Sequence, residues 1–216
     1  MSRDPDSFRI GEQSNWNERL SLFGAINWCQ MIPMGYMAKH TEGSPGWRRP
    51  PNVFDVYSVS ACVNDDFADY VDYWKHNCWW FFDSPEVIQS VARENSIDLQ
   101  GTKLFYYEAH EMELADGVWR PFSPGPVWPV PPHVVPPTQK QLEGFDVVTF
   151  WVENSPAPEY SPLSGNGLAN ELHTNAHCLF DTFDEAYTAL NSGKFDGCEP
   201  GALRIFAVYS VDWSSS

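Results

Sequence analysis

The sequence predicts an α+β fold made of two pseudo-symmetric repeated half-domains with a mainly antiparallel sheet. Three observations predict it: two acidic blocks share a residue pattern, each contains one amphipathic stretch of helical length, and each ends in a long apolar, β-rich run. Each unit has the order strand, variable segment, short strand, helix, long strand. The chain has 216 residues, of which 43% are hydrophobic and 15% aromatic, so it is long enough to bury a sizeable core.

The two blocks resemble each other at three places. Residues 54–59 and residues 145–150 are both β-rich runs that begin with Phe-Asp-Val. Further along, each block places a His and a Cys before an apolar run that ends in Phe-Asp-Ser or Phe-Asp-Thr. The long apolar runs then follow a glycine, at residues 104–107 and 203–209. A repeat of about 65 residues in only two copies indicates paired half-domains rather than a solenoid.

Both expected helices have local start signals. Ser84 is a suitable N-cap with Pro85 at the first helical position, which predicts a helix over residues 85–94. Thr182 and Glu185 have the spacing of a capping box, which predicts a helix over residues 183–190.

The chain divides into four segments by composition. We expect an N-terminal extension packing on the core (1–51), a first acidic α+β unit (52–116), a proline-rich connector (117–138) and a second acidic unit (139–216), with 52–216 forming one compact domain. Eight of the 17 residues from Pro121 to Pro137 are proline, which favours polyproline II. The alternative for this segment is a ligand for an aromatic-groove domain, since PxxP spacings occur.

The charge restricts the partners. The formal net charge is -16, and residues 52–116 carry 13 acidic and 3 basic side chains while residues 139–216 carry 11 and 3. Such acidity argues against direct binding of nucleic acid or an anionic membrane, and it favours a basic protein partner. No apolar run has membrane-spanning length. The polar N-terminus and the odd number of cysteines, five, predict a cytoplasmic protein with reduced thiols, although a mature secreted chain would look similar.

The strongest candidate interface is an acidic aromatic stretch in the first block. A helix over residues 65–75 would gather carboxylates on one side and aromatic rings on the other, as a binder of a basic protein does. The candidate interface residues are Asp65, Asp66, Asp69, Tyr70, Asp72, Tyr73 and Trp74. The alternative is an ordinary amphipathic helix whose aromatic side chains all belong to the core.

One group of residues could carry metal or nucleophile chemistry. It comprises His76, Cys78, His173, His177 and Cys178, and His173 and His177 have an H-x3-H spacing. Zinc requires three or four such ligands, and a Cys/His nucleophile requires an orienting third group. The simpler interpretation is a half-buried short strand in which cysteine is a small core residue. We therefore expect no cofactor, no metal and no catalytic residues.

The sequence favours a binding protein over an enzyme, because it holds no strong catalytic motif. The leading hypothesis is an acidic cytosolic protein that neutralises a basic partner, such as an immunity protein or antitoxin against a toxin. Two alternatives stay open: an enzyme or metal- or small-ligand-binding protein with the His/Cys site between the halves, and a structural or assembly component of a phage or secretion particle. The sequence does not predict the oligomeric state.

Overall fold

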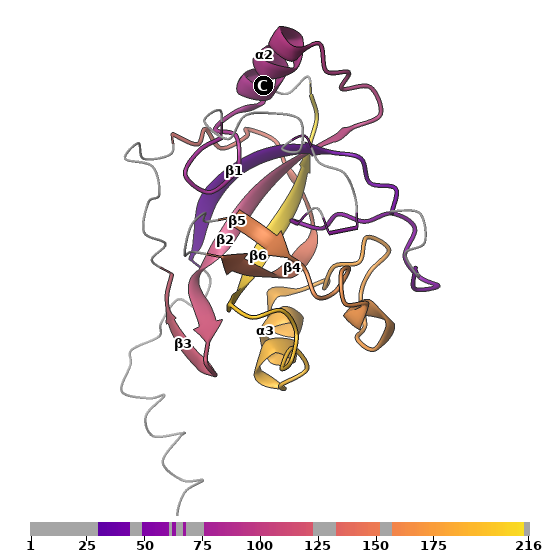
Figure 1. The fold of residues 1–216 in the computed structure, drawn as a ribbon, viewed down its shortest axis with the longest axis vertical. Helices are drawn as coiled ribbons and strands as arrows, with labels where there is room; N and C mark the ends of the chain where they lie inside the picture. The colour runs from indigo at the N-terminus through magenta and orange to yellow at the C-terminus, as the bar shows by residue number, and fades with distance from the viewer. Residues whose placement is uncertain are drawn as a thin grey trace, which may run out of the picture. The chain divides into compact units, whose positions relative to one another are not determined.

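The core of the fold is a curled antiparallel sheet with two α-helices (Figure 1). The computed structural model describes residues 30–43, 49–60, 62–63, 67, 76–122, 133–151 and 157–213. The sheet has the order β1-β2-β6-β4-β5, with β3 paired to β2, and every pairing is antiparallel. The strands are β1 (Met31–Lys39), β2 (Lys103–Ala115), β3 (Val118–Pro121), β4 (Gln141–Trp151), β5 (Ala157–Tyr160) and β6 (Ala202–Val211).

The helices confirm the local signals. Helix α2 (Pro85–Asn95) begins with Pro85 directly after Ser84, although the Ser84 side chain makes no capping hydrogen bond. Helix α3 (Phe183–Asn191) begins with the full capping box of Thr182 and Glu185. A short 3₁₀ helix, η3 (Leu168–Asn170), precedes α3. None of the described helices is long and apolar enough to cross a membrane.

Two buried clusters form the core. The first includes the buried face of α2 and the side chains of Phe206 and Val208 on β6. The second includes the buried face of α3 and the neighbouring β6 residue Ile205. Because successive side chains of a strand point to opposite faces, β6 contributes to both clusters and connects them.

The first strand differs from the sequence prediction. Residues 54–59 form no strand but an irregular segment, and Phe54 is 74% exposed. The outer strand beside β2 is instead β1, in a part of the chain that the sequence assigns to the N-terminal extension. Contacts group residues Met31–Ser216 into one compact unit.

An asparagine-centred loop closes against β1. The side chain of Asn77 donates to the carbonyl oxygen of Met34 at 2.8 Å and accepts the backbone N–H groups of Trp79 and Phe81 at 3.0 and 3.1 Å. A Cβ atom on Gly35 would lie 2.6 Å from a backbone oxygen of this loop, so the close approach requires glycine.

A second loop closes against β4 with the same arrangement. Asn175 donates to the carbonyl oxygen of Glu143 at 2.9 Å and accepts the backbone N–H groups of His177 and Leu179 at 2.9 and 3.2 Å. A Cβ atom on Gly144 would again lie 2.6 Å from a backbone oxygen of the loop. The two loops therefore attach to the sheet through matching hydrogen bonds and a matching glycine contact.

Candidate functional site

The irregular segment 49–60 brings polar side chains to one end of the sheet. Its backbone is held by the hydrogen bonds Phe54 N–H to Ala176 O at 2.8 Å and Tyr57 N–H to His177 O at 3.1 Å. These bonds attach the segment to the loop before α3. They fix the positions of Asp55 and Tyr57 above the start of β2.

Asp55 connects a histidine to a lysine. Its Oδ1 lies 2.5 Å from Nδ1 of His177, and its Oδ2 accepts a hydrogen bond from Nζ of Lys103 at 2.9 Å. Lys103 also donates to the hydroxyl of Tyr57, whose ring stacks on His177 with the centroids 4.0 Å apart. Four side chains from three separate parts of the chain therefore form one connected network.

The network shifts the ionisation of its members. Burial raises the pKa of Asp55, but hydrogen bonds from Lys103 and His177 outweigh burial and hold that pKa below its usual value. Burial raises the pKa of the Tyr57 hydroxyl, while donation from Lys103 opposes the rise. The arrangement is therefore most stable with Asp55 charged and the Tyr57 hydroxyl protonated.

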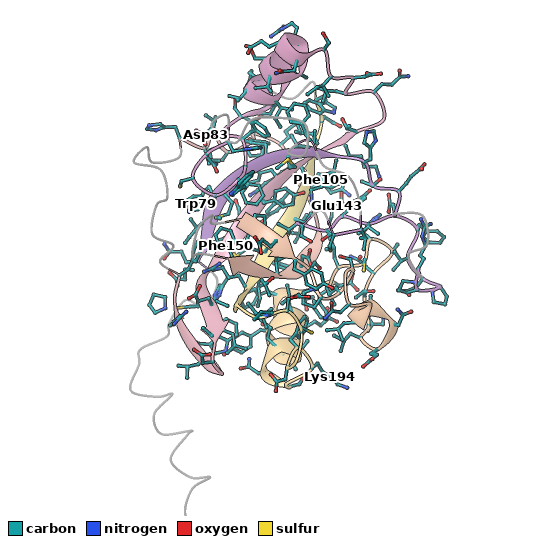
Figure 2. The ribbon with its side chains drawn as sticks, in the orientation of Figure 1. Trp79, Asp83, Phe105, Glu143, Phe150 and Lys194 are labelled. Atoms are coloured by element: carbon teal, nitrogen blue, oxygen red, sulfur yellow. The ribbon has the colours of Figure 1, made fainter. Side chains whose placement is uncertain are left out.

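Glu143 extends the network to a cleft. Its Oε2 lies 3.9 Å from Nε2 of His177, and its Oε1 accepts the hydroxyl of Ser210 at 2.5 Å. Figure 2 labels Glu143 beside the sheet. The carboxylate, with the side chain 11% exposed, faces a cleft of about 560 Å³ at the ends of β2, β4 and β6. A cleft of this size is within the range of small-molecule sites.

A second polar centre is completely buried. Asp146 on β4 is 0% exposed, and its carboxylate accepts the N–H groups of Val59 and Val147 at 2.9 and 2.8 Å. It also accepts the hydroxyl groups of Ser161 at 2.7 Å and Ser58 at 3.2 Å. Burial penalises the charged form and raises the pKa of Asp146 to about 6, although these donors oppose the rise.

Lys39 holds the same segment from another side. Its ammonium is fully buried and donates to the carbonyl oxygens of Ser58 and Val59 at 2.8 Å and of Ser60 at 3.0 Å. Residues 58–60 are thus held by a buried cation through their carbonyl groups and by Asp146 through an N–H and a hydroxyl. Because these groups have no contact with solvent, we assign this centre to the attachment of the segment rather than to chemistry.

The residues that the sequence proposes as an interface cannot be placed. Asp65, Asp66, Asp69, Tyr70, Asp72, Tyr73 and Trp74 all lie outside the described residues. Phe67, on the expected apolar face of the same stretch, is buried, and its ring contacts Phe82 with the centroids 5.4 Å apart.

The proposed His/Cys residues occupy different environments. His76 is buried against the rings of Trp80 and Phe82, and His173 is exposed. Cys78 and Cys178 are both buried, which raises the pKa of each thiol and disfavours the reactive thiolate.

The five proposed ligands do not assemble into a metal site. In the described part of the chain, no three His, Cys, Asp or Glu side chains lie close enough together to hold a metal ion. Of the five, only His177 belongs to the network around Asp55.

Sequence reasoning did not identify four of the residues that matter here: Asp55, Lys103, Glu143 and Asp146. The signal for two of them was the Phe-Asp-Val triplet at residues 54–56 and 145–147, which attracted attention as a strand repeat. The two aspartates have different environments, one half-exposed in the network and one fully buried. Lys103 and Glu143 lie in no motif, and only the folded sheet brings them together.

Comparison with protein-family models, with curated proteins and with solved structures finds no match to this chain.

Proposed function

We propose that this chain is an acidic binding protein that neutralises a basic protein partner, with an immunity protein or antitoxin against a toxin as the concrete form. The observation that supports the proposal is a run of exposed carboxylates between residues 157 and 200. The exposed acidic residues are Glu159, Glu171, Asp181, Asp184, Glu185, Asp196 and Glu199. Lys194 is the only Lys or Arg in that range, and Figure 2 shows it beyond α3.

The physical reason is electrostatic steering. Seven carboxylates on one continuous stretch of chain produce a negative potential, which accelerates association with a basic surface and repels nucleic acid. Screening over about 8 Å at physiological salt makes this contribution strongly dependent on ionic strength. The acidic aromatic stretch at residues 65–74 is a proposed second part of the interface, where the aromatic side chains would supply contact area.

The proposal places the protein in a reducing compartment such as the cytoplasm. Cys62, Cys78, Cys178 and Cys198 form no disulfide in the part of the chain that the structure describes, which supports this placement.

The test compares two charge-neutralised variants. One carries Glu171→Gln, Asp184→Asn, Asp196→Asn and Glu199→Gln, and the control carries four substitutions outside this range: Glu42→Gln, Glu94→Gln, Asp98→Asn and Asp116→Asn. The partner is captured from a source-cell extract at low salt, identified by mass spectrometry and purified. Association rates are then measured by stopped-flow at several salt concentrations.

We expect association of the unmodified chain to slow about tenfold between about 0.05 and 0.5 M salt. The first variant should associate slowly at low salt, and the control should behave as the unmodified chain does. A rate that is independent of salt, or equal effects of the two variants, would contradict the proposal.

We also propose that the two halves are copies of one duplicated unit. The support is the matching attachment of the two asparagine-centred loops, followed in each half by a helix and a long central strand. This alignment pairs Gly35 with Gly144 and Asn77 with Asn175. It replaces the alignment of Phe54 with Phe145, because residues 54–59 form no strand, and it shifts the proposed His/Cys equivalence by two residues.

A further inference from the structure

The cleft at the strand ends presents charges of both signs. It is lined on one side of the charge balance by the ammonium groups of Lys103 and Lys140, and on the other by the carboxylates of Glu143 and Asp212. Its other lining residues are Tyr57, Thr102, Leu104, Gln139, Gln141, Ser210, Val211 and Trp213. The cleft therefore combines donors, acceptors and apolar surface in one open cavity.

The two lysines are fixed by carboxylates that do not line the cleft. Asp55 binds Lys103 at 2.9 Å, and Glu108 binds Lys140 at 2.5 Å. Lys140 is further held over the ring of Tyr209, 3.8 Å from its centroid. Their positions are set before any ligand arrives, which reduces the entropy lost on binding.

Glu143 has a different environment. Its carboxylate accepts one hydroxyl, from Ser210, and no Lys or Arg of the described residues pairs with it. The nearest cationic candidate is Nε2 of His177 at 3.9 Å, whose other nitrogen is already bound to Asp55. A half-buried carboxylate without a cation is stabilised by a positively charged ligand group, because partial burial has removed some of its hydration.

We propose that this cleft binds a small zwitterion, an α-amino acid or a short peptide with an apolar side chain. The ligand ammonium lies at Glu143, and the ligand carboxylate lies at Lys103 beside the Tyr57 hydroxyl. The apolar part of the ligand contacts Leu104, Val211 and Trp213. The proposal is independent of the acidic binding surface, since that surface lies in residues 157–200.

The charges of the lining decide the ligand class. A neutral sugar would leave Glu143 without a cation while covering it, and a dianion would approach two carboxylates in a chain of net charge -16. A simple cation would meet two ammonium groups. A zwitterion places one charge beside each sign, so neither set of side chains is covered without a partner.

The first experiment is binding to the full chain. The twenty amino acids and a set of di- and tripeptides are screened by thermal shift, and the best free amino acid and best peptide are titrated by calorimetry. If leucine is the best amino acid, two analogues separate its charges: leucine amide, which lacks the carboxylate, and isocaproate, which lacks the ammonium. We expect each analogue to bind at least about tenfold more weakly than leucine.

Three variants then test the assignment of residues. Glu143→Gln keeps an acceptor for Ser210 but removes the charge, and should weaken binding about 10- to 100-fold. Lys103→Gln should weaken binding of the zwitterion while leaving binding of leucine amide unchanged. Glu159→Gln is the matched control on β5 and should bind as the unmodified chain does.

Several results would overturn the proposal. These are no binding of any amino acid or peptide at about 10 mM, equal binding of leucine and either analogue, or unchanged binding by Glu143→Gln. If Glu143→Gln does not fold, the comparison of leucine with its two analogues on the unmodified chain still decides. Tighter binding of peptides than of free amino acids would assign the cleft to a peptide terminus.

Discussion

The buried carboxyl of Asp146 should make the protein less stable as the pH rises. Its pKa is 3.8 in the absence of burial and about 6 in the fold. Below both values the carboxyl is protonated in both states. Between them the unfolded chain loses the proton and the folded chain retains it, so ionisation favours unfolding. A shift of about 2 units corresponds to about 3 kcal/mol at high pH, of which about 2 kcal/mol develops between about pH 4.5 and pH 8.

The variant Asp146→Asn isolates this contribution. Its amide cannot ionise, so the difference in unfolding free energy between the unmodified chain and the variant should shift by about 2 kcal/mol against the unmodified chain over that pH range. Urea denaturation at fixed temperature, followed by aromatic fluorescence and circular dichroism, measures the difference at each pH. Other carboxylates titrate in both proteins and cancel. A difference that is constant with pH, or that changes in favour of the unmodified chain, would refute the reasoning.

Three further perturbations test the attachments of the sheet and the network. Gly144→Ala should cost more than about 2 kcal/mol by urea denaturation, because the new Cβ meets a backbone oxygen, whereas Gly117→Ala, with open space around it, should cost only about 1 kcal/mol. Asn175→Ala removes three hydrogen bonds and should cost about 3 kcal/mol; a loss below about 1 kcal/mol would show that the loop is held by other contacts. Asp55→Asn should destabilise the protein above the unfolded pKa of Asp55, and the effect should vanish as the pH falls, since its folded pKa is lowered; NMR titration checks the sign.

The helices were predictable because their signals are local. The capping box of Thr182 and Glu185 lies within four residues, and Pro85 fixes the first turn of α2 by its own geometry. The long strands β2 and β6 were predictable from their apolar runs. All of these features depend on residues that are neighbours in sequence.

Strand β1 was not predictable for a physical reason. Pro33 and Gly35 both argue against a strand in local sequence, but β1 lies at the edge of the sheet and changes register between these two residues. Residues 54–59 show the opposite case, since their β-rich composition suggests a strand. Their polar groups are instead bound by Lys39 and Asp146, from parts of the chain that the pattern does not connect.

The same separation explains why the cleft was missed. Lys103 begins β2, Glu143 lies near the start of β4, and Ser210 lies near the end of β6. The strand order β2-β6-β4 places these ends side by side, and antiparallel pairing brings the end of β6 to the starts of its two neighbours. A site formed by topology has no motif in the sequence.

The net charge therefore combines groups with different functions, and this affects how the binding proposal must be tested. Asp146 is fully buried, Glu143 faces the cleft, and the exposed carboxylates of residues 157–200 produce the field that a partner meets. Lowering the pH through about 6 would protonate Asp146 and change stability before it neutralised that field. Weaker association at low pH would thus have two causes. Variation of salt at about pH 8, where Asp146 stays ionised, changes only the screening of the exposed charges, so salt rather than pH separates steering from folding.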